Sequence, residues 1–161
     1  MAAFSIAHRG LFVFAFVMGL AGNAPTAQAA GTLSEVASYN DGTVKVDLDD
    51  YVDGPKVVAL MGMKGNGVSI SFAFDQAEWP KLLAIWTNAL AKTGPDFTTA
   101  GSLTEVGSSA QCVITMAGGP AVRITIVDPT AGSLVYTVAP GDQAAFDQAL
   151  RETGNAATIV N

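Results

Sequence analysis

The chain has 161 residues, with 8 lysine and arginine residues against 14 aspartate and glutamate residues, and its formal net charge is −6. An acidic chain repels phosphate backbones and anionic lipid headgroups, which argues against nucleic-acid and membrane-surface partners. Half of the residues are hydrophobic, and the length suits a single domain with a core of its own.

The first segment, residues 1–29, predicts a cleavable signal peptide. His8 and Arg9 give it a weakly positive start, and Leu11 to Ala21 form an uncharged apolar run that is too short to span a bilayer. Ala27-Gln28-Ala29 provides the small-x-small pattern that signal peptidases cut. We therefore expect an exported protein, periplasmic or secreted, whose mature part is one domain of residues 30–161 with net charge −7 and no membrane span.

The expected mature part contains no histidine, because His8 is the only one in the chain. Serine and cysteine nucleophiles therefore lack their commonest activating base. Cys112 is the only cysteine, so no internal disulfide can form, and its place in an alternating strand pattern predicts a buried structural thiol. These features favour a protein that is not an enzyme.

The mature part contains an internal repeat. Three pairs of similar segments follow one another in the same order, at offsets that change little along the chain, which indicates two tandem copies of about 31–92 and about 101–155. The pairs are 31–38 with 101–108, 55–57 with 120–122, and 75–83 with 142–150.

The first copy predicts four strands and a helix. Its strands are expected at 33–39, 44–48, 57–63 and 68–74, with an Asp-Gly hairpin turn at 40–42 and a glycine-rich turn at 64–67. The helix begins either at Asp75, where Glu78 completes a capping box, or at Trp79, because Pro80 is tolerated only in the first turn. Its apolar stripe, which contains Trp79 and Trp86, predicts burial against a sheet.

The second copy repeats the scheme with a thinner helical stripe. Strands are expected at 103–106, 111–116, 122–127 and 134–138, and a helix at 142–153 with Phe146 and Leu150 facing inward. The predicted fold class is therefore α+β: two tandem ββββα repeats related by a pseudo-two-fold axis, with antiparallel sheets each backed by one helix.

This order of elements over about residues 31–155 resembles the duplicated four-strands-then-helix plan of the Whirly-type single-stranded DNA-binding proteins. The resemblance is one of topology, and it implies the architecture and, as an alternative function, an exported binder of single-stranded nucleic acid. The chain departs from that family in its negative charge and its export signal, and no binding residue carries over.

The densest group of candidate ligands is the acidic loop expected at 47–53, with Asp47, Asp49, Asp50 and Asp53. Calcium prefers several oxygen ligands from one loop, although the spacing is not that of an EF-hand. The alternative is a solvated acidic turn. A calcium site here would serve a metal-binding or carboxylate-based enzyme-like domain, and no other cofactor is expected.

Two further segments allow a site or a purely structural role. Residues 62–67 offer either a backbone cradle for an anion or a hairpin turn, and the second interpretation fits better because no helix follows. Tyr39, Tyr51 and Tyr136 are candidates to line a ligand groove. The leading hypothesis is a small, non-enzymatic binding or interaction domain for an unknown protein or small molecule, with a homodimer through an exposed sheet edge as a further option.

Overall fold

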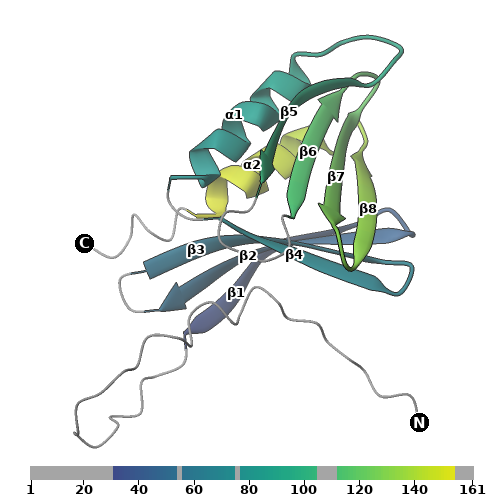
Figure 1. The fold of residues 1–161 in the computed structure, drawn as a ribbon. Helices are drawn as coiled ribbons and strands as arrows, with labels where there is room; N and C mark the ends of the chain where they lie inside the picture. The colour runs from purple at the N-terminus through teal and green to yellow at the C-terminus, as the bar shows by residue number, and fades with distance from the viewer. Residues whose placement is uncertain (1–30, 54–55, 75–76, 105–111, 155–161) are drawn as a thin grey trace, which may run out of the picture.

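In the computed structural model of the protein, described over residues 31–53, 56–74, 77–104 and 112–154, four strands and a helix are followed by four more strands and a second helix (Figure 1). The first unit comprises β1 (Thr32–Asn40), β2 (Val44–Asp53), β3 (Lys56–Gly65), β4 (Val68–Phe74) and α1 (Trp79–Leu90). The second comprises β5 (Thr98–Thr104), β6 (Val113–Gly118), β7 (Val122–Asp128), β8 (Gly132–Val138) and α2 (Gln143–Glu152). Each set of strands forms one antiparallel sheet in chain order, which confirms the predicted α+β fold.

Short turns with left-handed residues connect the hairpins. Between β1 and β2, the Asp41 carboxylate accepts the backbone N–H groups of Thr43 and Val44, both at 2.8 Å, and Gly42 has φ +90°. Between β3 and β4, Asn66 and Gly67 have φ values of 51° and 76°, as a two-residue hairpin turn requires. Asn66 and Gly67 therefore form the turn, and Lys64 and Gly65 end β3, in agreement with the hairpin interpretation of that segment.

Alternation along the strands places one face of each sheet in a common core. In β2, the side chains of Val44, Val46 and Leu48 are buried, whereas the residues between them are half-exposed. In β7, Val122, Ile124 and Ile126 are buried in the same way. The buried side chains of both sheets and both helices form one hydrophobic cluster, so the two units do not have separate cores.

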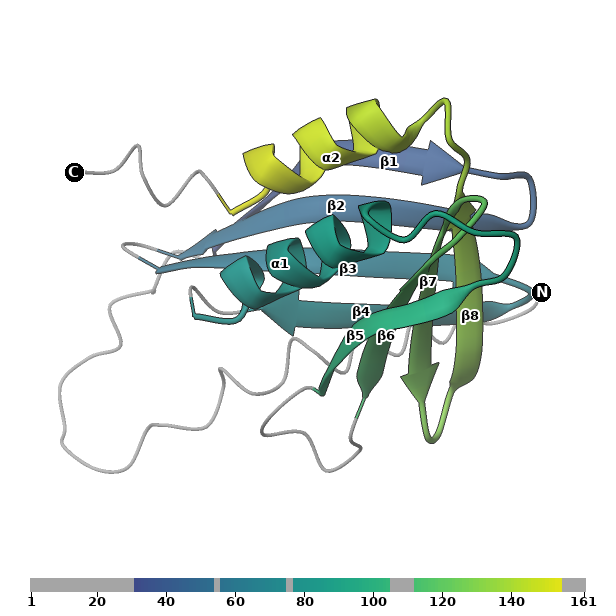
Figure 2. The same ribbon diagram turned by 90° about the horizontal axis from the view of Figure 1, so that it is seen from above.

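The two helices lie side by side over the inner face of the first sheet, as Figure 2 shows from above. α1 also packs against β5 and β6, and β8 crosses β2, β3 and β4. The fully buried ring of Phe146 in α2 joins these parts, because its centroid lies 4.8 Å from that of Tyr39 in β1, 5.1 Å from that of Trp86 in α1 and 6.3 Å from that of Tyr136 in β8.

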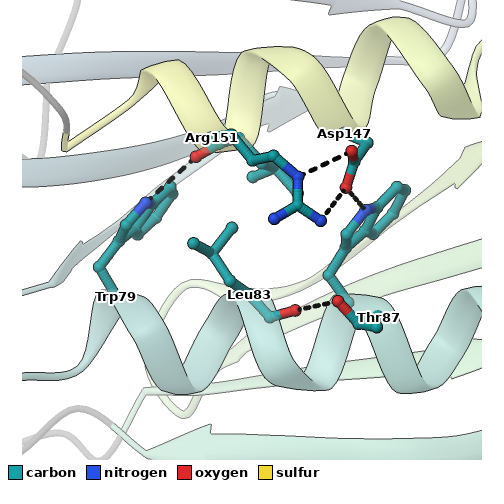
Figure 3. A network of polar contacts seen from close by, with 7 residues as sticks. Trp79, Leu83, Thr87, Asp147 and Arg151 are labelled. Atoms are coloured by element: carbon teal, nitrogen blue, oxygen red, sulfur yellow. Dashed lines mark hydrogen bonds and ion pairs between the residues drawn. The ribbon is translucent and has the colours of Figure 1, made fainter.

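Polar contacts tie α1 to α2 (Figure 3). The indole of Trp79 donates to the carbonyl of Leu150 at 3.2 Å, and the indole of Trp86 donates to the carboxylate of Asp147 at 3.0 Å. Arg151 donates to both oxygens of Asp147, at 2.8 and 2.9 Å. The predicted burial of both tryptophans is confirmed, and their ring nitrogens are satisfied by the other repeat.

The start of α1 settles one of the alternatives that the sequence allowed. The helix begins at Trp79 with Pro80 in its first turn, and the preceding Glu78 makes no side-chain capping bond. Asp75 and the expected signal peptide lie outside the described residues. α2 spans Gln143–Glu152, close to the predicted 142–153.

Within the described residues, the matching leucines of the two repeated segments do not occupy equivalent places. Leu33 pairs with Tyr51 near the end of β2 and is 59% exposed, whereas Leu103 pairs with Ile114 near the start of β6 and packs on the core. The fifth strand was expected at 103–106, but β5 runs from Thr98 to Thr104. Identical leucines therefore face opposite sides of their sheets, although the order of elements repeats.

Candidate functional site

The acidic segment 47–53 is not a loop, because β2 continues to Asp53. Alternation then sends its carboxylates to opposite faces of the first sheet: Asp47, Asp49 and Asp53 point to the outer face, and Asp50 points inward. Asp50 is only 4% exposed, and its carboxylate accepts the backbone N–H of Gly154, just after α2, at 2.7 Å. The four predicted calcium ligands therefore do not converge on one point.

The electrostatics of this strand follow from that placement. Burial raises the pKa of Asp50, and the hydrogen bond from Gly154 opposes the rise only in part. Partial burial also raises the pKa of Asp49, with further contributions from the negative charges of Asp47 and Glu35. Lys45 forms an ion pair with Asp47 at 2.7 Å. In the described part of the chain, no three or more histidine, cysteine, aspartate or glutamate side chains are grouped to hold a metal ion.

The other candidate residues take mainly structural positions. Cys112 is buried, as predicted. Tyr39 and Tyr136 both lie against Phe146 in the core, and the Tyr39 hydroxyl donates to the carbonyl of Ala145 at 3.0 Å. Tyr51 points to the outer face of the first sheet, where its ring packs against Gly31. The three tyrosines therefore do not line a common groove.

Two sheet faces remain uncovered by any described helix or strand (Figures 1 and 2). The outer face of the first sheet carries both charged and apolar side chains. Across the strands, Glu35 lies opposite Asp49, and Lys45 lies opposite Lys64. The large apolar and aromatic side chains of this face are those of Leu33, Tyr51, Val58 and Leu60. Its charged side chains with described positions are Glu35, Lys45, Asp47, Asp49, Asp53 and Lys64. This mixture of both signs is typical of a sheet face that is exposed to water.

The outer face of the second sheet has a different composition. Each strand contributes three outward residues, and together they are threonine, serine, valine, one alanine and one arginine. We call this surface the hydroxyl–valine face; its residues are Thr99, Ser102 and Thr104 from β5, Val113, Thr115 and Ala117 from β6, Arg123, Thr125 and Val127 from β7, and Ser133, Val135 and Thr137 from β8. None of them carries a carboxylate, although the chain as a whole is acidic.

The valines of the hydroxyl–valine face form an apolar patch. Val113 lies directly opposite Val127 across the β6–β7 pair, and Val135 is diagonal to Val127 across the β7–β8 pair. Val127 and Val135 are 41% and 44% exposed, and they are two of the three large hydrophobic side chains exposed in the described part of the chain. The third, Leu33, lies on the outer face of the first sheet.

Arg123 is the one charged residue of the hydroxyl–valine face, and it lies in an end row opposite Ala117 and Thr137. Its guanidinium carbon is 3.7 Å from the ring centroid of Phe97. This cation–π contact fixes the side chain and covers part of its hydrophobic stem. The outward residues of the second sheet form three rows across its strands, and the two rows that lack Arg123 contain no charged residue.

Sequence reasoning missed this face, although a signal for it was present. The strands of the second copy were predicted correctly at 111–116, 122–127 and 134–138 within a residue or two. Their outward positions carry threonine, serine and valine, with Arg123 as the one charged residue, whereas the outward positions of the first sheet carry several charges. Reading the outward residues of each strand as a set would have separated the two sheets.

No protein-family model and no curated protein matches the sequence. Within the described residues, no helix is both long enough and apolar enough to cross a membrane.

Proposed function

We propose that the protein is an exported, non-enzymatic binding domain that holds a partner against the hydroxyl–valine face. The observation that carries this proposal is the contrast between the two open sheet faces. The outer face of the first sheet carries six charged side chains with described positions as well as the exposed Leu33, whereas the other face has one charged residue, Arg123, and two exposed valines. Depletion of charged residues is a property of the centre of a protein interface.

Export is part of the proposal and rests on the N-terminal sequence. The apolar run from Leu11 to Ala21 and the cleavage pattern at Ala27-Gln28-Ala29 support release into the periplasm or the medium. A non-enzymatic role is supported by the absence of histidine from the expected mature chain. The partner is then a protein or another neutral surface and not a polyanion, because the expected mature chain, with net charge −7, repels polyanions.

The test compares two variants of the protein recovered from the extracytoplasmic fraction of its own host. Val127→Glu with Val135→Glu places two charges on the hydroxyl–valine face, and Leu33→Glu places one at a more exposed apolar position on the first sheet. Native mass spectrometry should find a bound partner on the wild type and on Leu33→Glu, and should find the double variant bare. The same spectra should show a mature chain that lacks 29 or 30 residues.

Two results would contradict the proposal. A partner that stays on the double variant would show that binding uses another surface. A wild type recovered only as bare monomer would leave the face without an occupant in its own compartment. Circular dichroism of all three proteins checks that the charges have not unfolded the sheet.

A further inference from the structure

We propose that Asn66 is a site of spontaneous deamidation. It is the one asparagine of the sequence that a glycine follows. In such a pair the backbone nitrogen of the glycine can attack the side-chain carbonyl carbon of the asparagine, because glycine has no side chain to crowd the approach. The reaction needs no enzyme, and it is independent of the proposed binding function.

The reaction has two steps, and water is its only co-reactant. First, the Gly67 nitrogen gives up its proton and bonds to Cγ of Asn66, while the bond from Cγ to Nδ2 breaks and ammonia leaves with a proton. The product is a five-membered succinimide ring. Water then adds to one of the two ring carbonyl carbons, and the bond from that carbon to nitrogen breaks. The result is aspartate or isoaspartate, each with one more negative charge than asparagine, and nothing is oxidised or reduced.

The structure places this pair where the ring can form. Asn66 and Gly67 are both exposed, and they are the two residues of the turn between β3 and β4. The last pair of the ladder joins Gly65 to Val68, so the peptide bond between Asn66 and Gly67 lies beyond the ladder. A Cβ added at Gly67 would meet no atom of the described residues within 4 Å. Ring closure therefore has space and breaks no pair of the sheet.

The turn between β1 and β2 contains the related pair Asp41-Gly42, but its reacting groups are held. An Asp-Gly pair closes the same ring with loss of water. The Asp41 carboxylate accepts the backbone N–H groups of Thr43 and Val44, both at 2.8 Å. The Gly42 N–H donates to Oδ1 of Asn40 at 2.7 Å. Ring closure would have to break these hydrogen bonds, so the folded protein spares this turn.

The two products differ in their effect on the β3–β4 hairpin. Aspartate tolerates the left-handed conformation of Asn66, which has φ 51°, and Asp-Gly is itself a preferred two-residue turn. Isoaspartate routes the backbone through Cβ and Cγ and so adds one atom to a turn whose length sets the register of the strands. The isoaspartate form should therefore unfold at a lower temperature than the aspartate form.

Timed incubation of the purified mature protein at neutral and at mildly alkaline pH tests the proposal. Samples are digested with pepsin in acid, where the backbone nitrogen does not ionise, and the peptides are analysed by mass spectrometry with fragmentation that distinguishes isoaspartate from aspartate. Both products should accumulate at residue 66 with first-order kinetics, faster at the higher pH. Anion-exchange chromatography of the intact protein should show a growing form with one additional negative charge.

Asn66→Gly is the matched control, because Gly-Gly also forms this type of turn and has no side-chain amide. It should give no form with additional charge. A second sample unfolded in urea should react at both Asn66 and Asp41, whereas the folded protein should react at Asn66 alone.

Two outcomes would overturn the proposal. A folded wild type that stays unmodified at residue 66, while the chain in urea is converted, would show that the turn blocks ring closure. An equal amount of the additional-charge form from Asn66→Gly would place the modification at another residue. Isomerisation of Asp41 at the same rate in the folded and unfolded protein would contradict the protection assigned to its hydrogen bonds.

Discussion

The outward positions of β2 carry Lys45, Asp47 and Asp49, whereas those of β7 carry Arg123, Thr125 and Val127. The inward positions of the same strands are alike, because both supply aliphatic side chains to one core. Core packing constrains the inner faces, so their similarity says little about function. The outer faces are free of that constraint, and the difference between them is therefore the informative feature of this molecule.

The largest expected effect is on the free energy of unfolding, and it depends on whether the substituted residue of β7 faces the core or the solvent. Ile126 is fully buried and Val127, the next residue, is 41% exposed. Ile126→Ala should lower the free energy of unfolding by about 2–5 kcal/mol, since it removes buried methyl groups and leaves a cavity. Val127→Ala should change it by less than about 1 kcal/mol. Urea unfolding at a concentration where the chain is monomeric measures both.

Equal losses for the two alanine variants would break the comparison. They would mean that Val127 is buried within the monomer and that the hydroxyl–valine face is not open to a partner.

A second, smaller effect on stability distinguishes two glycines, each in a central strand of its sheet. Gly118, in β6, faces α1 so closely that a methyl group would collide with the backbone carbonyl of Ala89. Gly62, in β3, faces outward, and a methyl group there would meet Ser71 Oγ at 3.6 Å, an ordinary contact. Gly118→Ala should destabilise the fold by about 1–3 kcal/mol through overpacking.

Gly62→Ala should leave stability unchanged or raise it by up to about 1 kcal/mol, because alanine restricts the unfolded chain. Thermal unfolding of the two variants beside the wild type tests the pair. A large loss at Gly62 would indicate that the outer face of the first sheet is covered and is not the solvated surface described above.

The sequence predicted the strands and helices well where the pattern is local. Alternation identified the core of β2, and the Asp-Gly and Asn-Gly turns located two hairpins. From the sequence, the second strand was predicted to end at residue 48, because consecutive aspartates suggest a loop. The strand continues to Asp53 because it pairs there with β1 and β3, and the buried Asp50 accepts a hydrogen bond from Gly154, 104 residues further along the chain. No local pattern encodes that contact.

The candidate site could not be predicted from local sequence patterns, because such patterns do not show how distant elements pack. Periodicity tells which side chains of a strand share a face, but not whether another element covers that face. The calcium hypothesis failed to foresee that Asp50 would point away from Asp47, Asp49 and Asp53, since it assumed a loop where residues can converge. The match between Gly31 to Ser38 and Gly101 to Ser108 indicated two copies, but it does not show that Leu33 faces outward and Leu103 faces the core.

The smallest expected effect is the pH dependence of stability that Asp50, the buried carboxylate on the inner face of the first sheet, contributes. The raised pKa of Asp50 means that, in the pH range above its ordinary value of 3.8, the folded state binds more protons than the unfolded state. The free energy of unfolding should therefore fall as pH rises through that range. Asp50→Asn keeps an acceptor for the Gly154 N–H and removes the buried charge, so it should flatten this slope and be at least as stable as the wild type at pH 7.

Asp147 supplies a control of opposite sign. The hydrogen bonds from Arg151 lower its pKa, so its contribution is present above 3.8 and is lost as pH falls through its folded value. Asp147→Asn should therefore be less stable than the wild type at pH 7, and the difference should shrink in acid. Urea titrations of both variants from pH 3 to pH 7 give the two slopes. If Asp50→Asn is instead less stable than the wild type at neutral pH, the hydrogen bond of the charged Asp50 with Gly154 contributes more free energy than the desolvation of that charge costs. The inner face of this sheet would then tolerate charge, as the outer face does.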